Sequence, residues 1–497
     1  MSLRRAAPLL AVVLLLSSAA SASAAGGGLS PGERATLLGY AEHTWASLVA
    51  MTDPASGLPA DSLEADGTAS VQTSTTNIGA YMWSTVVADR LGIIDHSEAV
   101  DRLTKTLTTL GTMERHEPSG QFYNWYNHST GAVLTVWPPT GATIKPILSS
   151  VDNGWLAAGL KVVAGAEPDV ADQAKALYDS MHFGFYYRPA ANRIAFFYAP
   201  SDGESPCCYD TIVSESRIAS YIGIATGEIP AKEYFGAWRT FPNSCDWSWQ
   251  ETKPLGVTRT YLGVSVFEGA YPNDDYRVVP GWGGSMFEAL MPTLFVPEEQ
   301  WGPRSWAVNH PLTVEAQIDH GLVDAGYGYW GFSPSNIPEG GYDAFGVDAI
   351  GMNPEGYFSN EDHTGVDRGF AGCPGRDPKP DPAPSAYTNG VVTPHASFLA
   401  LRWAPEMALE NLDNLRSDFA IYDKWGFRDS VNVDSGVVSG SYLSLDQGMI
   451  MGAIGNALAG DVLRDAFATK DVRQALQPVI SMETFGAGPR DAADDLH

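Results

Sequence analysis

The chain has 497 residues, of which 44% are hydrophobic, so it is long enough to bury a large core. It has 58 acidic and 30 basic residues, giving a formal net charge of −28 at pH 7. A protein this acidic repels nucleic acid and anionic membranes, and the same charge argues against a polyanionic substrate.

Residues 1–24 have the features of a cleavable export signal. They combine a basic start at Arg4 and Arg5, an apolar run over Leu9–Leu16 and a small-residue cleavage sequence ending at Ala24. No later run reaches the roughly 18 apolar residues of a membrane span. We therefore expect a secreted, extracellular protein with no membrane insertion, and we expect it to be a monomer.

Helices dominate the expected secondary structure. Apolar periodicity and capping residues predict helices over residues 30–49, 76–91, 95–113, 150–164, 170–182, 209–227, 285–291, 311–325, 394–402, 405–419, 444–458 and 472–476. Residues 228–284 and 326–387 are predicted to be long loops rich in Trp, Tyr, Gly and Pro. A few short strands are expected between the helices, and residues 486–497 are expected to be a disordered tail.

This order of elements has no βαβ alternation and no GxGxxG motif, and no linker clearly divides it. We therefore predict an all-α fold in one domain over residues 25–485. An α/α toroid fits, in which consecutive helices alternate between an inner and an outer ring and the aromatic loops build a cleft at one end.

The segment 209–227, YDTIVSESRIASYIGIATG, is apolar nearly all round and is predicted to be a core helix capped by Asp210 and stopped by Gly227. Glu215 falls on an apolar face of this helix. Burial raises the pKa of a carboxyl group, as a general acid at neutral pH requires. The alternative is a structural ion pair, for example with Arg217.

Three further acids have either a catalytic or a capping interpretation. Glu288 in the sequence Ser-Met-Phe-Glu and Asp446 in Ser-Leu-Asp-Gln both fit capping boxes. Asp152 lies at a predicted helix start and could cap it. Glycoside hydrolysis needs two carboxyl groups, one to protonate the leaving oxygen and one to activate water or attack the sugar. Glu215 is the first candidate for the proton donor, and Asp152 and Asp446 are further catalytic candidates.

Aromatic and polar runs supply candidates for sugar binding. They include Asn124, Trp125, Tyr126, Trp282, Tyr329 and Trp330, each of which could instead pack within a loop. The histidines show no HExxH-type spacing, and no GxSxG is present, so no metal site and no cofactor are expected. Calcium binding by the acidic segment 353–382 is an alternative without EF-hand spacing.

The four cysteines are candidates for disulfides, because an exported protein meets oxidising conditions. They are Cys207, Cys208, Cys245 and Cys373. Neighbouring Cys207 and Cys208 are not expected to bridge each other, so each would pair with Cys245 or Cys373. A metal site is the alternative, although no CxxC spacing supports it.

Eight sequence blocks follow one another between residues 35 and 480. They are TTNIGAYMWS (75–84), FYNWYN (122–127), SVDNGWLAAGL (150–160), SESRIASYIGIATG (214–227), GWGGSMFEALMP (281–292), GYDAFGVDAIG (341–351), VVTPHASFLAL (391–401) and SLDQGMI (444–450). In this order they resemble the bacterial "glucoamylase-like" domain family, which includes endo-β-1,2-glucanases and the cyclisation domain of cyclic β-1,2-glucan synthases.

This resemblance implies an (α/α)6 barrel, a glucan substrate and acid/base cleavage of a glycosidic bond. It implies an acidic role for Glu215 and Asp152, and it makes Asp446 a candidate for the second carboxylate. Further candidates for contact with the substrate lie within the same blocks: Asn77, Arg217, Glu288 and Gln447. The segment 353–384 differs from the family pattern.

We therefore expect a secreted glycoside hydrolase that cleaves a neutral β-glucan, most readily a β-1,2-linked one. A polysaccharide lyase on the same toroid is one alternative, but lyases act on uronates and need a basic subsite, which the net charge disfavours. A non-catalytic glycan-binding protein is the other alternative, and it would bind oligosaccharides without turnover.

Overall fold

The computed structural model describes residues 28–240, 253–352, 383–387 and 390–490. The predicted export signal, Cys245, Cys373 and the acidic segment 353–382 lie outside these residues. The helices are α1 (Pro31–Met51), α2 (Thr75–Arg90), α3 (His96–Leu110), α4 (Ser150–Ala166), α5 (Ala171–Asp179), α6 (Arg217–Ala225), α7 (Met286–Leu290), α8 (Glu298–Trp301), α9 (Trp306–Asp319), α10 (Pro394–Ala400), α11 (Pro405–Asp418), α12 (Ser444–Leu458), α13 (Val462–Phe467) and α14 (Lys470–Ile480).

The strands are short, except in one sheet. They are β1 (Ser62–Glu64), β2 (Gln72–Ser74), β3 (Arg115–His116), β4 (Gln121–Phe122), β5 (Trp125–Asn127), β6 (Leu148–Ser149), β7 (Tyr187–Arg188), β8 (Arg193–Ile194), β9 (Phe197–Tyr198), β10 (Leu255–Tyr261), β11 (Val264–Asn273), β12 (Tyr276–Val278), β13 (Gly281–Trp282), β14 (Ser335–Asn336), β15 (Tyr342–Asp343), β16 (Gly351–Met352), β17 (Val391–Val392), β18 (Tyr422–Asp423), β19 (Gly426–Phe427), β20 (Val431–Asn432), β21 (Ser441–Leu443) and β22 (Gly488–Pro489).

Six helices form a closed series of neighbours. Helix α2 packs against α4, α4 against α6, α7 against α10, α10 against α12, and α12 against α2. Helices α6 and α7 are joined by the Arg217 guanidinium, which donates to the carbonyls of Glu288 and Ala289. In α2, α4 and α12 nearly every residue is buried, as expected for helices surrounded by others.

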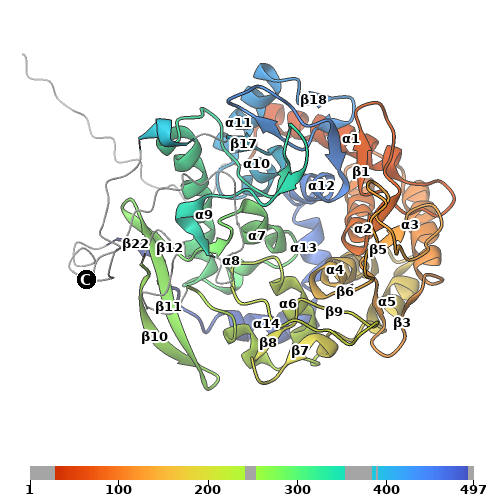
Figure 1. Cartoon of the computed structure of the whole chain (residues 1–497), viewed down its shortest axis with the longest axis horizontal. Coiled ribbons are helices and arrows are strands. Elements are labelled where there is room, and N and C mark those ends of the chain that lie inside the picture. Colours follow the sequence, from red (N-terminus) through yellow and green to blue (C-terminus); the bar gives the residue numbers. More distant parts are fainter. Residues whose placement is uncertain (1–27, 241–252, 353–382, 388–389, 491–497) are drawn as a thin grey trace, which may run out of the picture.

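A second set of helices packs on the outside of the first. Helix α1 contacts α2 and α12, α3 contacts α2, α5 contacts α4, α14 contacts α6, α9 contacts α7, and α11 contacts α10. In Figure 1, α3, α5, α9 and α11 lie at the periphery around the central helices. Helices α3 and α14 each bury one apolar face, which is typical of outer helices.

The closest approach between inner helices depends on two glycines. A Cβ atom on Gly159 of α4 would lie 2.8 Å from the Cα atom of Gly79 on α2. Any side chain at Gly159 would therefore push α2 and α4 apart. The buried apolar side chains form one cluster that runs from Leu37 to Phe485.

Short strands lead into the inner helices. Strands β2, β6, β17 and β21 each end within two residues of the helix that follows, and β13 ends four residues before α7. They pair with strands from the loops: β2 with β5, β6 with β9, β13 with β16, β17 with β20, and β21 with β1. These pairings hold the aromatic loops against the beginnings of the inner helices.

Most helix predictions are confirmed. Each predicted helix other than 209–227 overlaps an observed helix over more than half the length of the predicted or the observed helix. Helix α9 begins at Trp306, before the predicted start, and contains Pro311. The helix predicted over 209–227 is wrong in its first half, because α6 begins only at Arg217. The stop at Gly227 is confirmed, since this glycine has a left-handed φ of 75° just beyond the helix.

The prediction of a loop over residues 228–284 is wrong for its second half. Strands β10, β11, β12 and β22 form an antiparallel sheet, in which the turn at Leu262 and Gly263 joins β10 to β11. The β-branched alternation in VTRTY followed by a glycine turn was a hairpin signal. Because β22 (Gly488–Pro489) pairs with β12, the chain is also ordered beyond residue 486, where the tail was predicted.

The pairing predicted for the cysteines is wrong for two of them. Cys207 and Cys208 form a disulfide with each other across a cis peptide bond. The expectation assumed a trans peptide, which holds neighbouring Cα atoms about 3.8 Å apart, whereas here they are 3.1 Å apart. The disulfide precedes the segment that carries Glu215.

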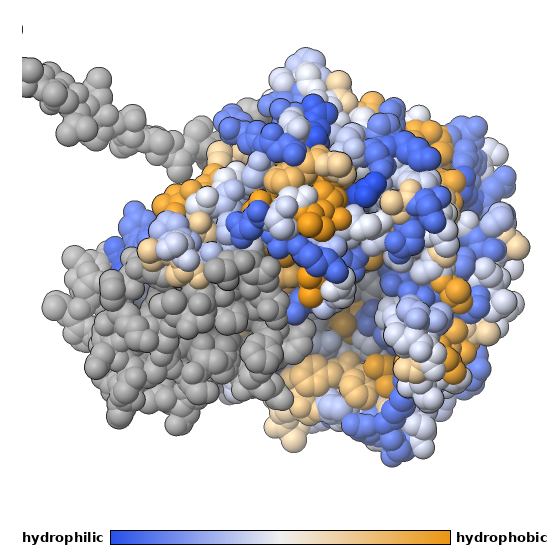
Figure 2. Space-filling view, turned by 45° about the horizontal axis from the view of Figure 1, so that its top comes forward, coloured by the Kyte–Doolittle hydropathy of each residue, from blue (hydrophilic) through white to orange (hydrophobic). Residues whose placement is uncertain are grey.

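The surface carries many of the polar and charged residues. Figure 2 shows hydrophilic residues spread over the visible face, with smaller hydrophobic patches between them. Among the described residues, no helix combines the length and the apolar character needed to cross a membrane.

Candidate active site

Glu215 lies in a turn immediately before α6, with Ser216 at the helix N-cap position. This position corrects the sequence prediction, which placed Glu215 inside a helix. The turn is held by Ser214, whose hydroxyl accepts from the Ser216 N–H. Glu215 is partly exposed, so its carboxyl group can meet a ligand while its surroundings remain protein.

In the described part of the chain, the Glu215 carboxyl group accepts a side-chain hydrogen bond from the indole of Trp155 on α4. Trp155 Nε1 donates to Glu215 Oε2 at 2.5 Å, and the Trp155 side chain is fully buried. Burial, and then the negative charge of Glu288, raise the pKa of the Glu215 carboxyl well above its usual range, against the lowering effect of the Trp155 bond. These surroundings therefore favour the protonated form of Glu215, as a general acid requires.

Glu288 is the acidic neighbour of Glu215. Its Oε2 accepts from the Glu215 backbone N–H at 2.7 Å, and it is only 8% exposed. Burial raises the pKa of Glu288 to about 7, while the bonds from Glu215 and Ser214 and the charge of Arg217 lower it. The Arg217 charge and the Glu215 N–H favour the ionised form of Glu288, and the charge of Glu288 in turn favours the protonated form of Glu215.

Arg217 is a structural residue rather than a substrate contact, which corrects the sequence prediction. It is 3% exposed, and its guanidinium pairs with Glu298 through Nε at 2.7 Å and Nη2 at 3.0 Å. Its remaining N–H groups donate to the carbonyls of Ser214, Glu288 and Ala289. Arg217 therefore fixes the Glu215 turn against α7 and has no donor left for a sugar.

Asp152 lies in the first turn of α4, and it is Ser149 that accepts the capping hydrogen bond. The Asp152 carboxylate instead accepts from Thr76 Oγ1 at 2.6 Å and from the Asn124 side-chain amide at 2.8 Å. Burial raises the pKa of Asp152 despite these bonds. The charge of Asp152 also contributes to the raised pKa of Glu215, so these two groups belong to one cluster.

Asp61, which the sequence interpretation missed, extends this cluster. Asn77 Nδ2 donates to Asp61 Oδ1 at 2.8 Å, and Gln72 Nε2 donates to Oδ2 at 3.4 Å. Burial and the charge of Asp152 raise the pKa of Asp61. Asn77 is 2% exposed, so its role is to orient Asp61. Asp61 lies in a loop without a motif, and only its neighbours in space reveal it.

Asp446 and Asp429 form the other side of the cluster. The two carboxyl groups interact, and each shifts the pKa of the other. Burial raises the pKa of Asp446 to about 7, and burial and the charge of Asp446 raise that of Asp429 well above its usual range. His395 Nδ1 lies 3.2 Å from Asp446 Oδ2, and burial lowers the pKa of His395 to about 4. Asp429 was also missed by the sequence interpretation.

We call Asp61, Asp152, Glu215, Glu288, Asp429 and Asp446 the acid cluster. Asp152, Glu288 and Asp446 each occupy the third position of an inner helix, and Asn77 occupies the same position in α2. The predicted capping box at Asp446 is wrong, because α12 has no side-chain cap. At Glu288, Ser285 caps α7, but the Glu288 carboxylate bonds Glu215 instead of returning to Ser285.

Two predicted aromatic residues lie beside the acid cluster. Trp125 is partly exposed, and its Nε1 donates to the Asn124 amide, which in turn bonds Asp152. Trp282 is partly exposed, and its backbone N–H donates to Val213, two residues before Glu215. Asn124, Trp125 and Trp282 therefore remain candidates for sugar contact.

The side chains of four other predicted substrate contacts are buried or hydrogen bonded within the protein. Tyr126 is fully buried and donates to the Glu114 carbonyl, and Trp330 is 1% exposed. Gln447, also 1% exposed, donates to the Phe427 carbonyl. The Tyr329 hydroxyl donates to Asp418 on the outer helix α11. The aromatic residues among them pack within the protein, because a flat ring can fill a core as well as contact a sugar.

Known proteins are similar to this chain in sequence and in fold. A family described as "Putative glucoamylase" matches residues 265–470, and one described as "Protein of unknown function (DUF3131)" matches residues 39–184. The cyclic β-(1,2)-glucan synthase NdvB of Rhizobium meliloti is 27% identical over 340 residues, or 64% of this chain. The match spans only 9% of the length of that relative.

Solved structures share the fold over nearly the whole chain. An endo-β-1,2-glucanase from Chitinophaga pinensis, in complex with sophorotriose and glucose, has a TM-score of 0.62 at 17% identity, covering 91% of this chain and 98% of that chain. An endo-β-1,2-glucanase mutant from Talaromyces funiculosus, in complex with β-1,2-glucan, has a TM-score of 0.64 at 11% identity, covering 92% and 91%. The family match and the curated relative support the resemblance to the glucoamylase-like family that the ordered sequence blocks indicate, and the solved structures show the shared fold.

Proposed function

We propose that this protein is a secreted glycoside hydrolase that cleaves a neutral β-glucan, most readily a β-1,2-linked one. The observation that carries the proposal is the contact between Glu215 and Glu288, in which Glu288 accepts from the Glu215 N–H and its negative charge helps to raise the pKa of the Glu215 carboxyl group. Such a pair supplies the proton donor and the ionised carboxylate that glycosidic cleavage needs.

In this proposal Glu215 protonates the leaving glycosidic oxygen. The Trp155 indole fixes the orientation of its carboxyl group, and Arg217 fixes the turn that carries it. Glu288 is the ionised partner, because the Glu215 N–H and the Arg217 charge stabilise its negative form. The structure thus favours Glu288 over Asp446 as the second carboxylate, since Asp446 is paired with Asp429.

Asp446 is the second candidate, because it is a buried carboxyl group whose pKa is raised to about 7. The stereochemical outcome depends on what the second carboxylate does. Direct attack by a carboxylate retains the anomeric configuration, whereas activation of water from the far side inverts it. The anomer that forms first, followed by proton NMR during hydrolysis, distinguishes the two pathways.

The acid cluster also bears on the substrate. A cluster of several acidic groups repels uronates, so a neutral glucan is the better substrate and a lyase reaction is disfavoured. The partly exposed rings of Trp125 and Trp282 offer apolar faces for pyranose rings. The β-1,2 linkage is supported by the endo-β-1,2-glucanases that share the fold. We further propose that the inner and outer helices form an (α/α)6 toroid, and that the protein is exported and acts as a monomer.

The test is a panel of linkage-defined glucans incubated with the mature protein, with the products separated by chromatography. We expect oligosaccharides from β-1,2-glucan, and loss of nearly all turnover in E215Q and E288Q. The matched control is E233Q, because Glu233 is also buried and has a pKa of about 7, but hydrogen bonds Ser220 instead of joining the acid cluster.

An active E215Q protein would exclude Glu215 as the proton donor. Tight binding of oligosaccharides by the wild-type protein without turnover, measured by calorimetry on the same sample, would instead indicate a glycan-binding protein. Ultraviolet-absorbing unsaturated products would indicate a lyase.

A further inference from the structure

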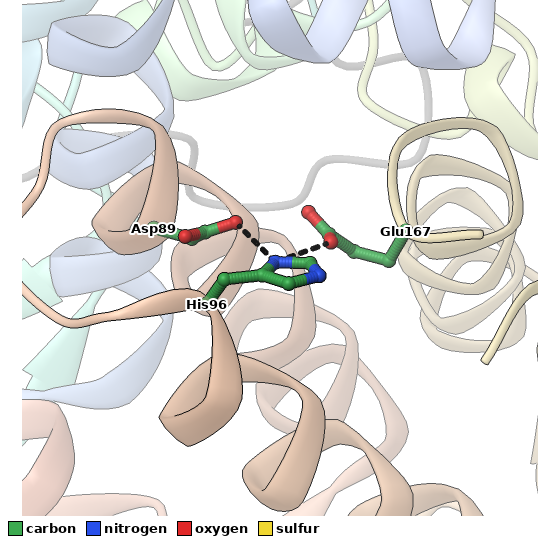
Figure 3. A group of neighbouring side chains, drawn as sticks. All are labelled: Asp89, His96 and Glu167. Carbon is green, nitrogen blue, oxygen red and sulfur yellow. Dashed lines mark hydrogen bonds and ion pairs between the residues drawn. The ribbon is translucent and has the colours of Figure 1, made fainter. Parts of the chain in front are cut away.

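A second group of titratable side chains lies at the other ends of α2 and α4. Asp89 is in the last turn of α2, His96 is the first residue of α3, and Glu167 is the C-cap residue of α4 (Figure 3). Because Asn77 and Asp89 are twelve residues apart on α2, this group lies about 18 Å along the helix from the Asn77 end. It is therefore separate from the acid cluster.

The three side chains converge on one point. In Figure 3 the Asp89 and Glu167 carboxylates approach the His96 ring from opposite sides. His96 Nδ1 lies 3.0 Å from Asp89 Oδ2 and 3.6 Å from Glu167 Oε2. Ligand atoms about 2.0–2.1 Å from a tetrahedral zinc ion lie roughly 3.3 Å from one another. The observed spacing therefore suits an ion of this kind with little movement of the side chains.

Glu167 gives an independent indication of a ligand. Its side chain is fully buried, and neither carboxylate oxygen makes a hydrogen bond within the described part of the chain. Oε1 has an ion pair with Arg90, whose Nη2 lies 3.1 Å away, but the nearest charged nitrogen to Oε2 is His96 Nδ1 at 3.6 Å. Because Asp89 and Asp169 add further negative charge, the buried Oε2 is costly unless another cation compensates it.

The far side of the His96 ring is also arranged for metal binding. Nε2 lies 3.1 Å from Asp169 Oδ2, so a proton on Nε2 leaves the Nδ1 lone pair facing Asp89 and Glu167. Histidines that ligate metals commonly donate their other ring N–H to a carboxylate in this way. Asp89 and Glu167 also lie at the C-terminal ends of their helices, where the helix dipole favours a cation.

We propose that Asp89, His96 and Glu167 bind one divalent transition-metal ion, with Zn²⁺ as the best match to one imidazole and two carboxylates. The ion joins the ends of α2 and α4 to the start of α3. Arg90 is the resident competitor, because its guanidinium also contacts Asp89 Oδ2 at 2.7 Å. Its side chain is 36% exposed, so it can turn away into solvent when the metal binds.

The test is titration of the metal-free full chain with ZnCl2, followed by calorimetry and by thermal unfolding. We expect one Zn²⁺ per chain at this site. At a free concentration of a hundred times Kd, the melting temperature should rise by about 3 °C for a folded region of this size. Hydrolysis of glucan should be unchanged, because the site lies apart from the acid cluster.

Variants separate a metal site from a simple ion-pair clamp. H96A and E167Q should lose this binding event and its thermal shift, whereas D169N should weaken binding by about 10-fold or more. R90A should bind Zn²⁺ more tightly than the wild type, because the competing cation is gone. The matched control is H43A, since His43 is also exposed but bonds the Tyr422 hydroxyl rather than carboxylates.

The outcomes are decisive in both directions. If H96A binds Zn²⁺ with the same stoichiometry and affinity as the wild type, or if the wild-type protein binds none, the proposal is wrong and the group is an ion-pair clamp. H96A changes an exposed side chain, with 52% of it accessible, so the variant should fold even if E167Q does not.

Discussion

Replacing Trp155 with Phe tests how the protein holds the proton on Glu215. The Trp155 indole N–H is the side-chain hydrogen bond that stabilises the ionised form of Glu215, and it therefore lowers the pKa of that carboxyl group. W155F removes this donor while keeping an aromatic ring. The pKa of Glu215, already raised by burial and by Glu288, should rise further.

The size of the change follows from the energy of the bond. A hydrogen bond to a charged group contributes about 1.5–3 kcal/mol, and one pKa unit corresponds to about 1.4 kcal/mol. W155F should therefore raise the pKa of Glu215 by about 1–2 units. Because a general acid acts only while protonated, activity is lost as the pH rises through this pKa. The alkaline limb of the pH–activity profile should move upward by the same amount.

The acid limb serves as an internal reference. Glu288 acts as the ionised partner, so activity should fall as the pH drops through its pKa of about 7. The Trp155 indole donates to Glu215 and not to Glu288, so this limb should stay nearly in place. The two limbs belong to a coupled pair, so they are compared between variants and not assigned as isolated values.

The assay is kcat/KM on the glucan identified from the panel, measured across the pH range for wild type, W155F and W83F. Trp83 is the matched control: it is also fully buried, but its Nε1 donates to the Gly448 carbonyl and not to an acid. Both variants should lose about 1–3 kcal/mol of stability from altered packing, which thermal unfolding measures. An alkaline limb in W155F that stays in place, or that moves downward, would refute the reasoning.

Three further predictions concern stability. R217M should lower the free energy of unfolding by about 3–5 kcal/mol in urea titrations, because it leaves the buried Glu298 carboxylate without its guanidinium; a loss below about 1 kcal/mol would contradict this. G159A should lose about 1–3 kcal/mol, because the added methyl group meets the Gly79 backbone. G39A should be neutral or slightly stabilising, since nothing lies within 4 Å of its Cβ position in α1; equal melting temperatures for G159A and G39A would refute the close approach.

Local sequence was sufficient for most of the helices. Capping residues and apolar periodicity act within a few residues, and the observed bounds of α2, α4 and α12 follow them closely. The hairpin of β10 and β11 had a local signal that was overlooked. The pairing of β12 with β22 could not be predicted, because β22 comes from residues 488–489, more than 200 residues after β12. Pairing over such a distance leaves no local pattern.

The sequence revealed some residues of the acid cluster and not others. Glu215 was identified because it lies among apolar residues in the sequence, although it turned out to precede its helix. Glu288 and Asp446 were noticed but were open to a capping interpretation that the structure rejects for their carboxylates. Asp61 and Asp429 could not be found, since each lies in a loop and its only relevant neighbours are distant in the chain.

The sequence by itself determined where most of the helices lie, that Glu215 falls among apolar residues, and which family the blocks resemble, because these depend on neighbouring residues. Only the tertiary structure decided which carboxyl groups meet, which aromatic rings stay accessible, and which arginine is structural. Those properties arise when the third positions of separate inner helices come together. Charge–charge interactions, and therefore pKa values, depend on distances in space that no stretch of sequence contains.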